Sequence, residues 1–448
     1  MGTSTGAFVG LAEKGVVGKA ALVTNWSQFV KEYGEFIPNG YLAYSVYSFF
    51  AEGGTSCYVV RAASDSAVKS FNTIQVDSTD VVKVTARTEG TWGDRITLEI
   101  GDPSDRPDAT HFKLTVKYAK SHEAEYVGEI SEEFDDIFLE NIQDTVNEVS
   151  NFISVETLSD TNKRPDNGTY PLTGGADGIK DADFIGDPVN KKGLHAFDEV
   201  DDINIVAIPD KAGDREVVLA GLNYCKNRKD CFFIADPPYG YIPTEVVKFK
   251  KGTDVENGGQ AFNSSYGALY YPWLYINDPL TGKKKLVPPS GAVIGTYAHT
   301  DSVRGAHKAP AGVAEGYLDS VVGIERIVTK GEHDLLNPAG INVIRTFTSG
   351  ICLWGTRTLS SDSEWKYINV RRLLLFIEES IDEGTQWVVF EPNDISLWGS
   401  IKRNITAFLL TVWRDGALFG TTSEEAFFVK VDEENNPPEV RDAGRATS

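Results

Sequence analysis

The hydrophobic pattern of this chain changes character twice, and this restricts the possible folds more than any other feature. Before about residue 63 and after about residue 176, short continuous apolar runs alternate with helical periodicity, as in a buried sheet covered by helices. Between them, several short stretches alternate apolar and polar residues, which is typical of half-buried antiparallel strands. We therefore expect an α/β core domain, a mixed sheet with flanking helices, built from both chain ends around an inserted β-rich domain.

The chain has 448 residues, too many for one ordinary core, so two or three domains are expected. The pattern assigns residues 1–63 to the N-terminal part of the core domain. Residues 64–175 form the inserted domain, and residues 176–448 form the C-terminal part of the core domain.

The N-terminal part predicts a strand–helix–helix–strand unit. Trp26, Phe29, Val30 and Tyr33 recur at the spacing that lines one helix face, and Gly34 is placed to end that helix. A second, aromatic helix is expected over residues 41–51, with strands over residues 7–10 and 57–61.

The inserted domain has a different pattern and a different charge. Residues 122–160 carry twelve Asp and Glu and no Lys or Arg. The spacing of their apolar residues, from Phe134 and Ile137 to Val146, predicts a helix with a solvated acidic face. Residues 167–178, rich in Gly and Asp, predict the linker back to the core. Strands are expected over residues 81–86, 95–100 and 112–118.

The C-terminal part predicts alternating helices and strands. The strands over residues 204–208 and 231–235, with a helix over 214–227 between them, predict a right-handed parallel crossover. A second such unit is expected further on, with Asp394 as the N-cap of its last helix. Its expected elements are a helix over residues 370–381 ended by Gly384, a strand over 386–390, a helix from 394 to about 416, and a strand over 426–431.

Charge and composition exclude several classes of protein. The net charge of −22 argues against nucleic-acid binding, because phosphate contacts need clustered Lys and Arg. No stretch approaches eighteen consecutive apolar residues, and no basic segment precedes an apolar one at the N-terminus. We therefore expect no membrane insertion, and synthesis and folding in the cytoplasm. The cysteines form no CxxC pair and are expected to be buried, reduced thiols; they are Cys57, Cys225, Cys231 and Cys352.

No motif indicates catalysis or cofactor binding. Residues 2–6 match G-x-S-x-G, but no strand precedes the serine, as a nucleophile elbow requires. The chain has no GxxxxGK[ST] loop, and the turn at residues 209–213 lacks GxGxxG. The six histidines do not occur at metal-ligand spacing. We therefore expect a non-enzymatic protein with no catalytic residue, cofactor or metal. The alternative to this interpretation is a cytosolic α/β enzyme or nucleotide-binding protein.

A series of motifs follows in order through the second half of the chain. They are Leu269-Tyr270-Tyr271-Pro272-Trp273, Asp278-Pro279-Leu280-Thr281-Gly282, Val287-Pro288-Pro289-Ser290-Gly291, Leu335-Leu336-Asn337-Pro338, Trp354-Gly355-Thr356-Arg357 and Tyr367-Ile368-Asn369-Val370-Arg371-Arg372. With these motifs, and with Thr3-Ser4-Thr5 near the N-terminus, the chain closely resembles the contractile tail sheath family over residues 1–62 and 180–442.

The resemblance implies a structural subunit, not an enzyme, which polymerises around an inner tube and contracts to drive that tube through a cell envelope. Its partners would be copies of itself in a helical sheath, the inner tail tube protein, and the baseplate and tail terminator proteins. It would end in a virion tail or a released contractile particle, and the sequence does not distinguish a phage tail from a bacteriocin or another injection device. In this family the inserted domain is variable, and we expect it to face outward.

Five basic residues are candidates for contacts. Arg371 and Arg372, at the start of a helix, suit ion pairs or hydrogen bonds either at a subunit interface or within one core. Lys402, Arg403 and Arg414 on the last long helix are candidates for facing the inner tube.

Members of the resembled family usually carry extensions at both ends, beyond Thr3-Ser4-Thr5 and beyond residues 440–442. These extensions add strands to neighbouring subunits, and strand addition supplies main-chain hydrogen bonds along an exposed sheet edge. Because this chain lacks them, we expect it to be monomeric alone or to associate weakly.

Overall fold

An eight-stranded sheet joins the N-terminal strands to strands from residues 205–353. The computed structural model describes residues 2–105, 110–122, 125–159, 163–256 and 258–439. The strands of this sheet are β1 (Gly6–Gly10), β2 (Ala20–Val23), β3 (Cys57–Arg61), β11 (Ile205–Ala207), β12 (Phe232–Ala235), β13 (Gly267–Tyr271), β17 (Ile341–Phe347) and β18 (Gly350–Leu353). Their order is β18-β17-β13-β12-β11-β1-β3-β2. β1 pairs in parallel with both β3 and β11, so strands some 200 residues apart in sequence are neighbours.

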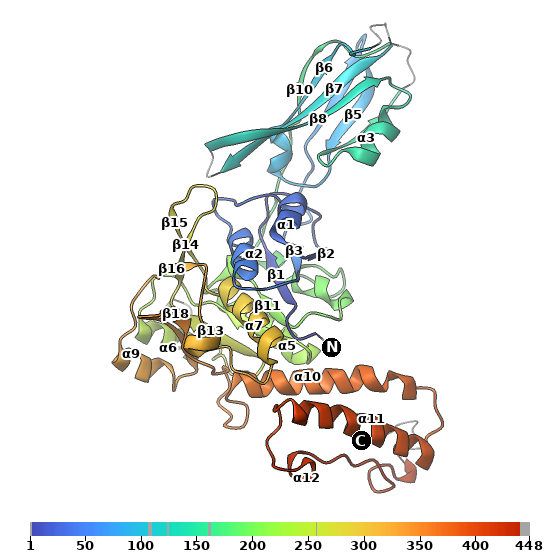
Figure 1. Ribbon diagram of the computed structural model, residues 1–448. Helices are drawn as coiled ribbons and strands as arrows, with labels where there is room; N and C mark the ends of the chain where they lie inside the picture. The colour runs from blue at the N-terminus through green and yellow to red at the C-terminus, as the bar shows by residue number, and fades with distance from the viewer. Residues whose placement is uncertain (1, 106–109, 123–124, 160–162, 257, 440–448) are drawn as a thin grey trace.

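Helices cover both faces of this sheet, and together they form what we call the body (Figure 1). One face packs against α1 (Trp26–Tyr33), α2 (Leu42–Ala51) and α7 (Ser290–Arg304), and the other against α5 (Arg215–Arg228) and α6 (Pro243–Lys251). Successive strand residues alternate between the two cores, as Phe8 and Val9 do, because strand side chains point to opposite faces. The parallel crossover from β11 through α5 to β12 is confirmed.

A smaller sheet and several short helices complete the body. The sheet has the order β15-β14-β16, and its first two strands form a hairpin whose turn leads into the three lysines at residues 283–285. These elements are β14 (Leu274–Asn277), β15 (Lys284–Val287), β16 (Val321–Ile324), α4 (Ala182–Ile185), α8 (Gly312–Glu315), α9 (Lys330–Leu336), and the 3-10 helices at Gly193–Glu199 and Pro209–Lys211.

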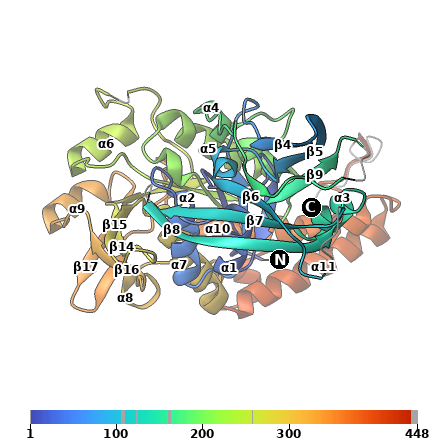
Figure 2. The ribbon, with the colours of Figure 1, turned by 90° about the horizontal axis from the view of Figure 1, so that it is seen from above.

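The strands between β3 and β11 form a separate part, here called the module (residues 71–171), with its own apolar core. Its two sheets have the orders β10-β6-β7-β8 and β4-β5-β9. Figure 2 looks down on the module, whose strands β7 and β8 extend across the top of the body. Its elements are β4 (Phe71–Val76), β5 (Thr79–Ala86), the 3-10 helix Thr91–Arg95, β6 (Ile96–Gly101), β7 (Phe112–His122), β8 (Glu125–Ile137), α3 (Ile142–Val149), β9 (Ile153–Thr157) and β10 (Gly168–Pro171).

The helix expected within residues 122–160 is wrong in its first part. Among the described residues, Glu125–Ile137 form strand β8, and the helix α3 begins only at Ile142. A β-bulge explains the error. Leu114 of β7 faces Phe134 of β8, and Phe112 faces Ile137, so β8 carries one extra residue between these pairs. Asp136 adopts a φ of 55° there. The bulge turns both Phe134 and Ile137 inward at a spacing of three, which imitates a helix. The linker expected over residues 167–178 is also wrong in part, because it contains β10.

The C-terminal part, here called the helical unit (residues 368–431), packs around a fourth, separate apolar core. It contains α10 (Ile368–Thr385), the 3-10 helix η4 (Gln386–Val388), α11 (Ile395–Arg414) and α12 (Ser423–Ala426). The Asp394 cap is confirmed, since its carboxylate accepts from the Leu397 amide at 2.9 Å. Residues 440–448 lie outside the described residues.

Three expectations for the helical unit are wrong. Residues 386–390 and 426–431 form no strand, and α10 continues through Gly384 to Thr385. The two strand-like segments instead pack Val388, Val429 and Val431 on the core between α10 and α11. Apolar composition alone does not make a strand, because a strand also needs a ladder partner.

Helices α2 and α7 cross in close contact because α7 presents glycine to α2. A Cβ added to Gly295 would lie 2.6 Å from the carbonyl oxygen of Phe49 and 2.7 Å from Cβ of Glu52. A Cβ at Gly291 would lie 2.4 Å from Cα of Ser45. Only a residue without a side chain permits this approach.

We therefore expect Gly295→Ala to lower the free energy of unfolding by about 2 kcal/mol, because the added methyl group overpacks the crossing. Gly384→Ala is the matched control, since a Cβ at this helical glycine meets nothing within 4 Å. It should raise stability by about 0.5 kcal/mol through helix propensity. Denaturant unfolding of both variants checks this, and equal effects would contradict the close-approach explanation.

Candidate functional site: the helical unit and its joint with the body

The carboxyl edge of the parallel strands, where α/β proteins usually bind ligands, is occupied by structural carboxylates. Asp210, after β11, accepts from the amides of Leu11 (2.6 Å) and Tyr41, at the start of α2. Asp236, after β12, accepts at 2.8 Å from the amide of Ser290, the first residue of α7. Burial raises the pKa of both carboxyl groups to about 7, although the amide donors oppose this rise. These acids hold helix starts in place.

Asp236 makes stability depend on pH in a defined window. Its folded-state pKa of about 7 exceeds the usual value of 3.8, so the folded protein keeps a proton that the unfolded chain loses as pH rises from about 4 to 7. The stabilisation that this bound proton gives to the folded state is complete below pH 4 and is lost as pH rises through 7.

Asp236→Asn keeps an oxygen for the Ser290 amide and cannot ionise. We expect its free energy of unfolding, relative to the unmodified chain, to improve by about 4 kcal/mol between pH 4 and pH 8. Asp201→Asn, at an exposed carboxylate, is the control and should show no such trend. Thermal or denaturant unfolding at several pH values measures the difference, and parallel pH profiles for all three proteins would contradict it.

A buried ion pair joins the helical unit to the body. Arg372 of α10 and Asp301 of α7 have side chains that are 4 % and 1 % exposed, and Nη1 of Arg372 lies 2.9 Å from Oδ1 of Asp301. Nη2 of the same guanidinium donates to the other carboxylate oxygen and, at 2.8 Å, to the carbonyl of Thr3. One side chain therefore ties together α10, α7 and the segment before β1.

The neighbouring Arg371 is also buried, and it stacks on aromatic rings. Its guanidinium carbon lies 3.5 Å from the ring centre of Trp365 and 4.6 Å from that of Tyr266. Two roles were expected for Arg371 and Arg372, at a subunit interface or within one core. The contacts described here are of the second kind, within one subunit. The sequence did not single out Asp301 as a partner, although it lies in a buried helix where an unpaired carboxylate would be costly.

Arg372→Met leaves the Asp301 carboxylate buried without its cation, so we expect a loss of about 3–5 kcal/mol in unfolding free energy. Arg403→Met, at an exposed arginine of the same unit, is the control and should change stability by less than about 0.5 kcal/mol. The double variant Arg372→Met with Asp301→Leu should recover at least half of the loss. A mild effect of the single variant would mean that the pair does not hold the joint.

The three basic residues expected to face a tube are all exposed on α11. Arg403 and Arg414 are eleven residues apart, which is about three helical turns, so they lie on one face. Lys402 lies about 100° around the helix from Arg403. In Figure 1, α11 lies on the side of α10 away from the body.

The helical unit also exposes large apolar side chains. In the segment after α10, Val389 is 68 % exposed and Phe390 is 98 % exposed. In the segment after α12, Phe428 is 86 % exposed, although Phe427 and Val429 on either side pack against the core. These are the two segments whose sequences predicted strands. We take these two segments as the candidate interaction surface, because large exposed apolar groups commonly mark one.

All four cysteines are buried and free of disulfides, as the sequence predicted. Among the residues that the structure describes, no cluster of three or more His, Cys, Asp or Glu side chains is arranged to hold a metal ion. None of the helices within the described ranges combines the length and apolar character that crossing a bilayer requires.

The family models identify this architecture. Residues 184–359 match the phage tail sheath protein central domain, and residues 360–445 match the phage tail sheath C-terminal domain. These adjoining stretches make up more than half of the chain. The chain therefore belongs to the phage tail sheath family, a family of structural proteins.

Individual relatives agree with this assignment. The chain is 27 % identical over 230 residues to the tail sheath protein of Vibrio phage KVP40, and 30 % identical over 186 residues to that of Burkholderia phage BcepMu. These matches cover 48 % and 39 % of this chain and 33 % and 37 % of the relatives. The chain thus spans little more than a third of the length of these curated relatives.

Solved structures share the fold over almost the whole chain. The contracted helical sheath of the anti-feeding prophage matches with a TM-score of 0.60 and 22 % identity, covering 100 % of this chain and 88 % of that one. The sheath tail protein of Listeria innocua matches with a TM-score of 0.64 and 13 % identity, covering 97 % and 90 %. The mixed α/β fold is therefore that of sheath proteins.

Proposed function

We propose that this chain is the subunit of a contractile tail sheath, which polymerises around an inner tube and contracts to drive the tube through a cell envelope. Family membership and the shared fold support this function. Contraction would be rigid-body movement of subunits past one another, without a nucleotide, cofactor or metal. A helical sheath needs heterologous contacts between copies, and the helical unit offers a surface for them.

The observation that carries the proposal is the pair of strand-like segments left without ladder partners. Residues 386–390 and 426–431 have the composition of strands. The first segment forms a 3-10 helix and a turn, and the second continues from the end of α12 as irregular backbone. Their outward side chains, Val389, Phe390 and Phe428, remain in solvent. Extended segments of neighbouring copies would supply the missing main-chain hydrogen bonds and cover these side chains.

The arrangement of the parts supports an orientation in the sheath. The module and the helical unit lie at opposite ends of the molecule, with the body between them (Figure 1). If Lys402, Arg403 and Arg414 on α11 face the inner tube, the module points outward. Residues 1–63 and 176–448 then form the core domain of the sheath wall, and residues 64–175 the outward domain. Baseplate and terminator proteins would cap the two ends of the sheath.

The subunit would assemble in the bacterial cytoplasm and leave in a virion tail or a released contractile particle. The test is therefore made in cells that produce the complete particle. Phe390→Asp with Phe428→Asp places charge where neighbouring strands would lie, so we expect particles with bare tubes and at least a tenfold loss of sheathed ones in electron micrographs.

Phe419→Asp is the matched control, because Phe419 is fully exposed in the same unit but lies outside both segments. This variant should give sheathed particles in normal number. Circular dichroism and thermal unfolding of the purified chains establish that all variants fold. Normal sheaths from the double variant would overturn the proposed assembly surface.

A further inference from the structure

The neck between body and module is a paired ribbon. The outgoing chain after β3 and the returning chain after β10 exchange main-chain hydrogen bonds. The Val68 amide donates to the Ala176 carbonyl at 2.8 Å, and the reverse bond is 3.0 Å long. Phe71 and Thr173 form a similar pair at 3.0 and 3.1 Å. The module is therefore attached by two strands held together, which resists twisting more than two separate linkers would.

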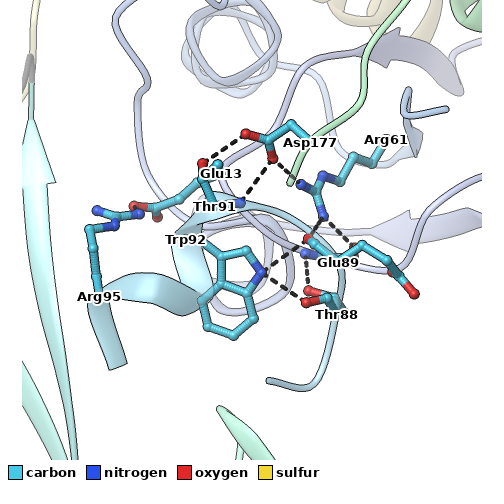
Figure 3. A network of polar contacts seen from close by, with 9 residues as sticks. Glu13, Arg61, Thr88, Glu89, Thr91, Trp92, Arg95 and Asp177 are labelled. Atoms are coloured by element: carbon cyan, nitrogen blue, oxygen red, sulfur yellow. Dashed lines mark hydrogen bonds and ion pairs between the residues drawn. The ribbon is translucent and has the colours of Figure 1, made fainter. Parts of the chain in front are cut away.

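A single buried guanidinium stands at the base of this neck (Figure 3). Arg61 is the last residue of β3, and its side chain is 2 % exposed. Its Nη1 donates to the carbonyls of Gly15 (3.0 Å) and Glu89 (2.7 Å), and its Nη2 lies 3.2 Å from Oδ1 of Asp177. Gly15 belongs to the body, Glu89 to the module and Asp177 to the returning chain, so this one group contacts all three.

Further polar contacts connect the same pieces. The Asp177 carboxylate accepts at 2.7 Å from the hydroxyl of Thr91, the first residue of the module's 3-10 helix. Glu13, in the body loop after β1, pairs with Arg95 of the module at 2.6 Å (Figure 3). The amide of Gly15 donates to the Thr88 hydroxyl at 3.1 Å. The loop between β1 and β2 therefore provides the body's polar contacts to the module.

Apolar packing is incomplete beside these contacts. A solvent-open cleft of about 540 Å³ lies between the two parts, and its lining includes Leu11 and Ile37 of the body, Trp92 and Arg95 of the module, and Asp177. An unfilled joint has few van der Waals contacts that would fix the angle between the parts. Directional polar contacts have to fix it instead.

We propose that Arg61 and Asp177 form a lock that sets the angle of the module to the body, so that the two parts move as one rigid arm. Without the lock, the module swings about the neck while the apolar cores of both parts stay folded. This device concerns the chain alone and does not depend on sheath assembly. In a helical array, it would make the module follow every rotation of the body.

The test removes the carboxylate while leaving the buried arginine its two carbonyl acceptors. In Asp177→Asn, hydrogen exchange at the Val68 and Ala176 amides should rise at least tenfold, because the neck opens locally. Exchange in β1, β3, β6 and β7 should stay unchanged. Small-angle X-ray scattering should fit one rigid shape for the unmodified chain and require several module positions for the variant.

Asp77→Asn is the matched control: the same substitution in the same module, at an exposed carboxylate that pairs with Lys163. It should alter neither measurement. Thr91→Val removes the hydroxyl that holds Asp177 and should raise neck exchange in the same direction as Asp177→Asn. Unchanged neck exchange in both neck variants would overturn the lock, and so would a uniform rise throughout the body, since that would mean general support of the fold.

Discussion

The parallel pairing of β1 with both β3 and β11 is the interaction on which the rest of the molecule depends. Gly6 of β1 aligns with Cys57 on one side and with Ile205 on the other. The chain between β3 and β11 therefore leaves and returns at nearby points of one sheet, and it has room to fold separately as the module. The same pairing buries the N-terminal strand in the centre, so the later half of the chain completes its core only when the first residues are in place. Two distant stretches of sequence thus become one domain.

Sequence patterns predicted the elements whose cause is local. β1, α1, α2 and β3, and the crossover through α5, follow from buried runs, helical periodicity and caps such as Asp394. The bulge in β8 could not be foreseen, because the backbone turn at Asp136 is fixed by pairing with β7. Arg61 was equally hidden, since its acceptors Gly15, Glu89 and Asp177 lie 46, 28 and 116 residues away in sequence. Long-range partners of this kind are a property of the assembled fold.

The two strand-like segments of the helical unit show where local preference and structure separate. Val, Phe and Trp favour strands mainly because they pack well on a pleated surface beside a neighbouring strand. In residues 386–390 and 426–431 that neighbour is missing, so the backbone turns and part of each segment faces solvent. The sequence predicted a strand, and the isolated chain cannot form one. This mismatch is what we expect of segments that pair with a neighbouring copy, as proposed above.

The molecule thus divides its stabilisation between two kinds of interaction. The body has two apolar cores, and the module and the helical unit have one each. Apolar contacts are non-directional, so they fix what lies inside a part better than how two parts are oriented. At both joints a buried arginine bridges the parts: Arg61 toward the module and Arg372 toward the helical unit. A guanidinium presents five donors in a fixed plane, which sets direction as well as distance. Burial also shields each guanidinium from competing water and salt. The angles at the two joints are therefore held by interactions whose strength depends little on the surrounding solution.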